Sequence, residues 1–217
     1  MAGRMVALIS GLMVAGCSVV GVRSGTEEPK YHVIDRVGSV EIRQYGPRIA
    51  AETVIEADED SARGEGFRRI AGYIFGANHS HAKIAMTAPV AQSVTAPVAQ
   101  SASEKIAMTA PVAQAQDASG RWVVRFFMPF GSTMASLPVP DDARVRLVEL
   151  GPETMGVIRF SGFASVSAMQ AHRAALLAAL QNAPWRPDGP PVAWYYDPPW
   201  TLPFLRRNEV AVPVSRP

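Results

Sequence analysis

Short runs of alternating apolar and polar side chains open the globular part of the chain. Residues 31–35 and 39–45 alternate in this way on either side of Gly38, a pattern typical of a β-hairpin. After a Gly-Pro turn, residues 48–56 alternate again, which predicts a third strand with one buried face. We therefore expect three strands before the first helix.

The next segment has the spacing of an amphipathic helix, predicted over residues 60–78. An acidic cluster that begins at Asp58 offers N-cap side chains and places negative charge at the helix start. One apolar stripe follows at Phe67, Ile70, Ala71, Ile74 and Phe75. Gly64, Gly66 and Gly72 interrupt the helix, each at a cost of about 1 kcal/mol relative to alanine. Such glycines permit close approach of a ligand or of another backbone, and we expect close packing on a sheet.

The second half of the chain repeats the same order of elements. Strands are predicted over 122–128, 144–150 and 155–163, a helix over 165–182, and final strands over 194–196 and 209–214. Each half thus consists of strands and one helix. The sequence predicts a single α+β domain of two similar halves, which share a continuous sheet or a distorted barrel with a helix on each half.

One segment occurs twice between these halves. Lys-Ile-Ala-Met-Thr-Ala-Pro-Val-Ala-Gln occupies positions 83–92 and returns at 105–114, with a shorter echo at 95–100. The copies span too little chain for a solenoid, and residues of these types pack and turn rather than carry out chemistry. We interpret the repeat as a local duplication that lengthens one hairpin or loop.

The composition describes an ordinary globular protein. Of its 217 residues, 48% are hydrophobic and 18% are charged, which is enough to bury the core of one large domain or two small ones. The formal net charge of +2 is too small to indicate nucleic acid as a partner.

The first residues resemble an export signal that ends in a lipid-attachment site. Arg4 precedes a short apolar run, and Ala-Gly-Cys ends it at Cys17, as in a bacterial lipobox. The predicted segments are a signal peptide (1–16), a tether (17–30) and a domain (31–217). Ser18 favours the outer membrane over the inner one, with the domain on the periplasmic face of the cell envelope. The alternatives are an ordinary N-terminal anchor, or a start site placed upstream of a cytoplasmic protein.

The familiar catalytic motifs are missing, among them Gly-x-Ser-x-Gly, phosphate-binding glycine loops and His-Glu-x-x-His. His79 and His81 could share a metal, but no nearby carboxylate or cysteine completes a ligand set, so two exposed loop residues are the simpler interpretation. Haem differs because one His, Met or Tyr can ligate its iron. Position favours His79 and His81 over the other candidates, which are His32, His172, Met86 and Met108. Each of these side chains can equally be exposed or satisfied in the core.

Several segments together resemble the SOUL haem-binding protein family. The helix sequence at 66–78 is followed by the segment at 83–90, and further similar segments lie at Tyr45, 127–129, 157–162, 196–199 and 206–209. The resemblance extends from about residue 31 to residue 214, nearly the whole predicted domain. The doubled segment lengthens one loop relative to animal members of the family.

The resemblance implies two βαβ-type halves that form a distorted antiparallel barrel or sheet with two helices, similar to the gyrase-inhibitor-like effector domains. It implies non-catalytic binding of haem or another tetrapyrrole in a surface pocket between the first helix and the loop before the last strand. Carried onto this sequence, the pocket residues are Arg63, Phe67, Arg68, Ile70, Ala71, Ile74, Tyr196, Trp200 and Arg206. Arg63 and Arg68 are the expected partners of the haem propionates. Gly64 and Gly72 leave room for a flat ligand but remove charge partners that relatives can have.

Three functions remain open on the sequence alone. A membrane-tethered haem or porphyrin binder ranks first, because apolar burial of a large flat ring supplies affinity and arginines set its orientation. A binding module for other hydrophobic molecules ranks second. A small-molecule hydrolase ranks third, and it would need a buried carboxylate or tyrosine that faces the pocket; Glu52, Tyr73 and Glu209 are the residues to inspect. We therefore expect a binding protein rather than an enzyme.

Overall fold

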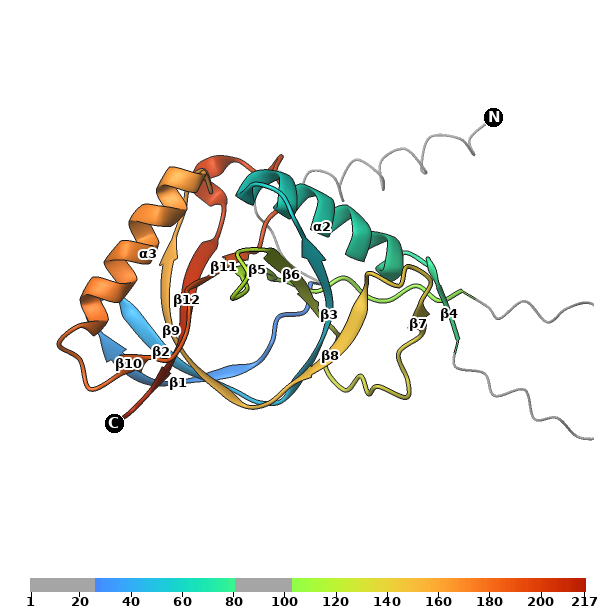
Figure 1. Cartoon of the computed structure of the whole chain (residues 1–217). Coiled ribbons are helices and arrows are strands. Elements are labelled where there is room, and N and C mark those ends of the chain that lie inside the picture. Colours follow the sequence, from blue (N-terminus) through green and yellow to red (C-terminus); the bar gives the residue numbers. More distant parts are fainter. Residues whose placement is uncertain (1–25, 81–102) are drawn as a thin grey trace, which may run out of the picture.

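The computed structural model describes residues 26–80 and 103–217 as an α+β fold on one curved antiparallel sheet (Figure 1). Across the sheet the strands follow the order β1-β2-β9-β12-β11-β5-β6-β3-β8, and β10 pairs with β12. They are β1 (Tyr31–Val37), β2 (Val40–Tyr45), β3 (Arg48–Ile55), β5 (Val112–Gln116), β6 (Trp122–Phe127), β8 (Arg146–Leu150), β9 (Glu153–Phe160), β10 (Arg186–Pro187), β11 (Val192–Tyr195) and β12 (Asn208–Ser215). The remaining elements are helices α2 (Glu59–Ile74) and α3 (Val166–Leu180), the 3-10 helix η1 (Pro203–Leu205), and a separate pair, β4 (Asn78–His79) with β7 (Val139–Pro140).

The two halves are related by an exchange of strands. The first half follows the order β2, β3, α2, β5, β6, and the second follows β8, β9, α3, β11, β12. The first strand of each half pairs with the second strand of the other half, as β2 with β9 and β8 with β3. The halves also meet where β5 pairs with β11. This confirms the predicted pseudo-repeat, and it makes the two halves one domain.

The sheet remains open within the described part of the chain. β1 and β8 are its two edges, so of the two predicted forms the continuous sheet is correct and the closed barrel is not. Both helices pack on the outer face of the curved sheet, α2 over β3 and β6 and α3 over β9 and β12 (Figure 1). In the same described residues, no helix is long and apolar enough to cross a membrane.

Helix α2 begins where the acidic cluster predicts and ends earlier than predicted. The Asp58 carboxylate accepts hydrogen bonds from the backbone N–H groups of Asp60 and Ser61, at 3.1 and 3.0 Å. A Cβ at Gly66 would lie 2.6 Å from a methyl carbon of Val124 on β6, so only glycine allows this close approach of helix and sheet. The predicted close packing is thus confirmed at Gly66.

Gly64 and Gly72 have more space. The nearest heavy atoms to a Cβ at these two positions would lie 3.5 and 4.0 Å away, at ordinary contact distance. The structure therefore leaves room for a side chain at either position. Close packing on the sheet does not explain these two glycines.

Helix α3 also has the predicted start. The Ser165 hydroxyl accepts from the backbone N–H of Ala168 at 3.2 Å, and the helix ends at Leu180, two residues before the predicted end. Its buried side chains Met169, Leu176 and Leu180 pack on the outer face of β9 and β12. Arg173 on this helix pairs with Glu59 of α2 at 2.6 Å, which ties the two helices together.

The inner face of the sheet carries a second layer of core. Alternate residues of the same strands point there, and they form a cluster that includes Tyr45, Ala50, Phe127, Met155, Trp194 and Ala211. The cluster draws on both halves, so it packs them against each other. It also surrounds the polar groups described below.

The second copy of the duplicated segment is built into the fold. Its last residues begin β5, Ile106 N donates to the carbonyl oxygen of Ile74 at 2.9 Å, and Gln114 is completely buried. Glu104 immediately precedes this copy. The Asn78 side chain donates to its carbonyl oxygen at 2.8 Å and accepts from its backbone N–H at 2.9 Å. The first copy lies outside the described residues, as do Met86, the predicted signal peptide and Cys17. The last part of the predicted tether contacts the domain, where Glu27 forms a bridge with Thr109.

Candidate functional site

Helix α2 presents an arginine near its N-terminal end and an aromatic ring near its middle. Arg63 Nη1 donates to the carbonyl oxygen of Ala164 at 3.2 Å, and its guanidinium carbon lies 4.9 Å from the centre of the Tyr195 ring. Phe67, one turn further along, is 41% exposed, and its ring centre lies 5.4 Å from that of Phe126. Here α2 meets both the loop before α3 and the end of β11.

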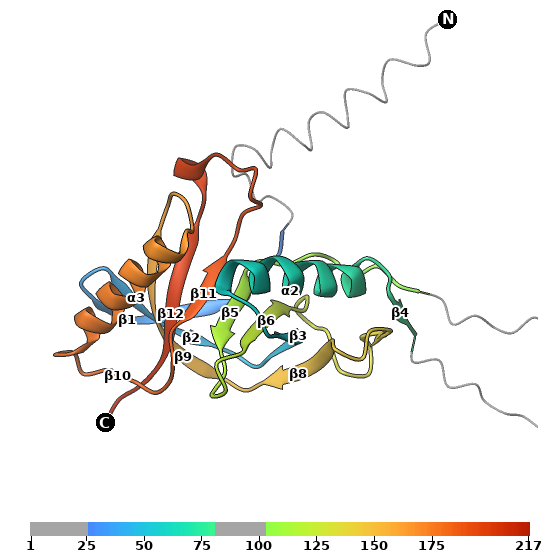
Figure 2. The ribbon, with the colours of Figure 1, turned by 45° about the horizontal axis from the view of Figure 1, so that its top comes forward.

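The connection between β11 and β12, drawn in red, stands out from the domain in Figure 2. Several of its apolar side chains are exposed. Trp200 is 63% exposed, Phe204 is 69% exposed, and Phe163 in the loop before α3 is 66% exposed. Arg206 Nε donates to the carbonyl oxygen of Thr201 at 2.7 Å, and its guanidinium carbon lies 5.3 Å from the centre of the Phe163 ring. We call the exposed side chains of these two loops the apolar loop patch: Phe163, Trp200, Leu202, Phe204 and Leu205.

The other predicted pocket residues have different surroundings. Ile70 and Ile74 are almost fully buried in the core between α2 and the sheet, and Ala71 is also buried. Tyr196 is buried on the inner face, whereas Arg68 is exposed. The structure therefore leaves Arg63, Phe67, Trp200 and Arg206 at least partly exposed, whereas it buries the three aliphatic residues between α2 and the sheet.

The predicted axial ligand His79 lies at the other end of α2. β4 follows the C-terminal end of the helix, whereas η1 lies beyond its N-terminal end in both views (Figures 1 and 2). The helix has 16 residues, and at 1.5 Å per residue it spans roughly 24 Å, more than the width of a porphyrin ring. His79 Nδ1 instead lies 2.7 Å from the carboxylate of Asp141. The structure does not bring His79 to the apolar loop patch, and His81 lies outside the described residues.

The remaining candidate iron ligands are scattered. His172 stacks on Phe160 with ring centres 3.7 Å apart, and its Nδ1 lies 2.8 Å from the carbonyl oxygen of Ala168. Met108 is 39% exposed, and His32 borders a cavity near the turn between β2 and β3. Over residues 26–80 and 103–217, no three His, Cys, Asp or Glu side chains gather in a way that could hold a metal ion.

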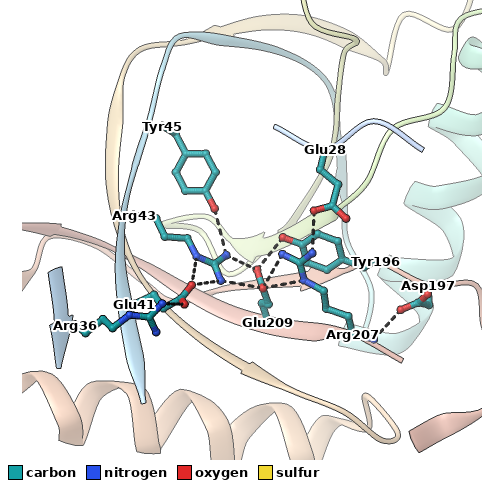
Figure 3. A network of polar contacts seen from close by, with 9 residues as sticks. All are labelled: Glu28, Arg36, Glu41, Arg43, Tyr45, Tyr196, Asp197, Arg207 and Glu209. Atoms are coloured by element: carbon teal, nitrogen blue, oxygen red, sulfur yellow. Dashed lines mark hydrogen bonds and ion pairs between the residues drawn. The ribbon is translucent and has the colours of Figure 1, made fainter. Parts of the chain in front are cut away.

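A buried carboxylate lies at the centre of a polar network on the inner face of the sheet (Figure 3). Glu209 on β12 has no exposed surface. It accepts from Arg43 Nη1 and Nη2 at 2.9 and 3.1 Å, from Arg207 Nε at 3.0 Å, and from the Tyr196 hydroxyl at 2.7 Å. Two arginines and one tyrosine thus saturate the carboxylate.

An outer ring of charges completes this network. Glu41 pairs with Arg43 at 2.8 Å and with Arg36 at 2.7 Å. Glu28, from the segment before β1, accepts from Arg207 Nη1 at 2.8 Å. Three glutamates therefore face three arginines, and the buried charges are balanced.

Burial and charge shift the pKa values of these groups in consistent directions. Burial is the largest cause acting on Arg43 and lowers its pKa, but the hydrogen bonds and charge of Glu209 outweigh it, so the net pKa is raised. Burial raises the pKa of Tyr45 to about 12. Burial, together with the charge of Glu209, holds the pKa of Tyr196 well above its ordinary value. Both tyrosines therefore stay neutral at physiological pH.

With this geometry established, comparison with known proteins identifies the family. The profile described as SOUL heme-binding protein matches residues 26–102 and 97–213, which is most of the chain. The chain belongs to the SOUL family. The two matches overlap, and each contains one copy of the duplicated segment.

Two relatives of this SOUL chain carry the name Heme-binding protein 2. The mouse protein is 39% identical over 85 residues, and the human protein is 48% identical over 58 residues. These alignments cover 35% and 26% of this chain, and 42% and 28% of the relatives. The chain thus matches less than half the length of either protein.

The fold of the SOUL chain is also found in a solved structure. The C-terminal domain of EcmrR superimposes with a TM-score of 0.55 at 11% identity, over 86% of this chain and 99% of that domain. At this identity the likeness shows the α+β fold alone.

The other two residues named for catalysis also have partners. Glu52, buried on β3, pairs with Arg125 at 2.7 Å and with Arg146 at 3.1 Å. The Tyr73 hydroxyl donates to the carbonyl oxygen of Pro138 at 2.9 Å, and burial raises its pKa to about 12. Each of the three candidates, Glu209 included, is engaged in contacts that hold the SOUL fold together.

Sequence reasoning named Glu209 and Tyr196 but missed Arg43 and Arg207. On β2 the apolar Val40 and Ile42 face the outer core, so the alternation predicts that Arg43 points to solvent. The opposite face is the buried inner face of the curved sheet, and Arg43 meets Glu209 across 166 positions in sequence. The one local signal was the spacing of two charged residues, Arg207 just before the last strand and Glu209 within it.

Proposed function

We propose that this SOUL protein binds haem or a related tetrapyrrole at the surface between the N-terminal half of α2 and the β11–β12 connection. The observation that supports this proposal is the apolar loop patch, which is bordered by Arg206 over the Phe163 ring and by Arg63, whose guanidinium donates to Ala164 next to Phe163. Phe67 is exposed one turn further along α2. Large exposed apolar groups on a soluble domain mark binding surfaces. The family profile and both relatives carry haem binding in their names.

This surface combines apolar side chains with arginines, which suits a ligand with a flat apolar ring and two carboxylates. The flat apolar ring would lie against Trp200 and Phe67, which are 63% and 41% exposed in the structure. Burial of such side chains contributes about 1.5–3 kcal/mol each. The guanidinium groups of Arg63 and Arg206 lie at the border of the patch, and guanidinium pairs well with a propionate carboxylate.

The proposed mode of binding is apolar docking without His79 as an axial ligand. His79 is separated from the patch by the length of α2 and is engaged with Asp141. The protein would then hold the macrocycle rather than the iron. Protoporphyrin IX, which has the same ring and propionates without a metal, would bind about as well as haemin.

A lipid at Cys17 would place this surface at a membrane, as the lipobox-like sequence predicts. Haem partitions into lipid, so an anchored binder could buffer or pass on haem within the cell envelope, with the domain on the periplasmic side. This part of the proposal rests on residues before the described structure. Incorporation of labelled palmitate that is lost in Cys17→Ser would test it.

Haemin titration of the purified protein, followed by Soret absorbance, tests the binding proposal. Saturable one-to-one binding with a defined Soret shift is expected, and His79→Ala should leave the affinity unchanged. Uptake that does not saturate, and that does not exceed uptake by an unrelated protein, would refute haem as the ligand. Binding of haemin together with failure of protoporphyrin IX would instead refute apolar docking.

A further inference from the structure

A cavity of about 500 Å³ lies near the turn between β2 and β3, apart from the proposed haem surface. Its walls come from the segment before β1, from the turn itself, and from the residues that follow β6. Tyr45 and Phe127 line the cavity and also belong to the core cluster on the inner face of the sheet. Lys30 and Phe130 line it as well. None of its lining residues belongs to the apolar loop patch or to the exposed face of α2.

Arg48 lines this cavity with an incompletely satisfied side chain. The side chain is 9% exposed, and its guanidinium carbon lies 4.5 Å from the centre of the Tyr45 ring and 4.9 Å from that of Phe127. Nη2 pairs with Glu153. Nε and Nη1 are buried and have no hydrogen-bond partner among the described residues. One of the most strongly hydrogen-bonding groups in proteins thus holds unused donors at the edge of a cavity.

The buried Nε and Nη1 groups of Arg48 need a hydrogen-bond acceptor. A buried polar group without a partner costs about 1–3 kcal/mol, and more when it is charged. The two acids that line the cavity are engaged elsewhere, since Glu28 accepts from Arg207 and Glu27 accepts from the backbone N–H of Phe130. Lys30 adds a second cation over the Phe130 ring, 4.2 Å from its centre. The described residues supply no acceptor for these two N–H groups, which leaves a bound molecule or water to supply one.

The other residues that line the cavity indicate the chemical character of its ligand. Ile49, Met128 and Phe130 contribute apolar surface, and four prolines line the cavity as well. The volume lies in the range of small-molecule sites, which combine apolar walls with a few placed polar groups. We propose that this cavity binds a small organic carboxylate with an apolar body, whose carboxylate accepts hydrogen bonds from the free N–H groups of Arg48.

The test uses a set of simple acids as probes: benzoate, 2-naphthoate and decanoate, each beside its neutral primary amide. Binding to the full-length protein is followed by ligand-observed NMR and by the Nε–H resonance of Arg48, identified by its loss in Arg48→Lys. At least one acid should saturate and shift that resonance. Arg48→Met should weaken it by about tenfold or more, the effect expected when a hydrogen bond to a charged group is lost.

Arg146→Met is the matched control, because Arg146 is an exposed arginine that pairs with Glu52 outside the cavity. It should leave the affinity for the acid unchanged, and the matching amide should bind more weakly than the acid. The proposal fails if none of the three acids saturates, in which case water satisfies Arg48. It also fails if Arg48→Met binds the acid as well as the parent protein does, or if haemin displaces the acid, because the two ligands would then share one site.

Discussion

Arg43 and Arg48 are two buried arginines on the same inner face, and they differ in how far their hydrogen bonds are satisfied. The side chains are 3% and 9% exposed, and each guanidinium stacks on an aromatic ring. Arg43 donates to the fully buried Glu209 and to Glu41, whereas Arg48 pairs, within residues 26–80 and 103–217, only with Glu153, which is 38% exposed. Burial alone therefore does not define the role of an arginine. The saturated group holds the two halves together, and the unsaturated group is available to a ligand.

The largest loss in the free energy of unfolding is expected from Glu209→Gln. Loss of the carboxylate leaves Arg43 and Arg207 buried without their central anion, and removal of one member of a buried ion pair costs about 3–5 kcal/mol. Urea unfolding, monitored by tryptophan fluorescence, measures this loss. Glu65→Gln is the control, since Glu65 is 46% exposed and pairs with an arginine that has other partners; it should change stability by less than about 1 kcal/mol. A small effect of Glu209→Gln would show that the network does not join the halves.

A loss of folding stability of intermediate size is expected at alkaline pH, when Tyr45 ionises. This residue lies between the two arginines. Burial raises its pKa to about 12, against an ordinary value of 10.0 for tyrosine. The folded state thus favours the neutral phenol, and this contribution is complete below pH 10 and is lost as the pH rises through about 12. The loss amounts to roughly 3 kcal/mol, because one pKa unit corresponds to about 1.4 kcal/mol.

Unfolding free energies measured from pH 9 upward check this effect. Stability should fall as the pH passes from about 10 to about 12. The fall should be shallower in Tyr45→Phe, which has no phenol to ionise. Identical slopes in the two proteins would mean that burial of Tyr45 does not control its ionisation.

The smallest change in the free energy of unfolding is expected from Arg48→Met. The methionine keeps an apolar stem against Tyr45 and Phe127, removes unsatisfied donors, and leaves Glu153 in contact with water. Replacement of a buried ion by an apolar group of similar volume is often neutral, so the free energy of unfolding should change by less than about 1 kcal/mol.

Arg43→Met provides the matched comparison, since it should cost about 3 kcal/mol because Glu209 loses two of its donors. Equal losses in the two variants, measured by the same urea unfolding, would erase the distinction between the two arginines.

Local patterns in the sequence predicted the local parts of the fold. The N-cap of α2 at Asp58, the close contact at Gly66, the hairpin around Gly38 and the start of α3 at Ser165 all depend on near neighbours or on one face of one element. The alternation along β2 also gave the correct outer face, through Val40 and Ile42. Motif order was enough to identify the family and, with it, the two-half architecture.

The tertiary parts of the site could not be predicted in this way. Arg43 lies on the polar face of β2, which gives no local sign of burial, yet strand exchange between the halves buries it against Glu209. The open donors of Arg48 depend on the distances from its nitrogen atoms to every neighbour, which no local pattern encodes. His79 was favoured as an iron ligand because it follows the end of the first helix, and the length of that helix separates it from the apolar loop patch.

The most direct test of the proposed function locates the haem surface. Haemin is titrated into the parent protein, into Phe67→Ala/Trp200→Ala, and into Phe130→Ala, whose aromatic ring is 76% exposed and lies outside the proposed surface. All three residues are exposed enough that the variants should fold. The double variant should bind haemin about tenfold or more weakly, since two apolar contacts are lost, and Phe130→Ala should bind it as the parent does. Unchanged affinity in the double variant, or an equal loss in Phe130→Ala, would contradict haem binding at this surface.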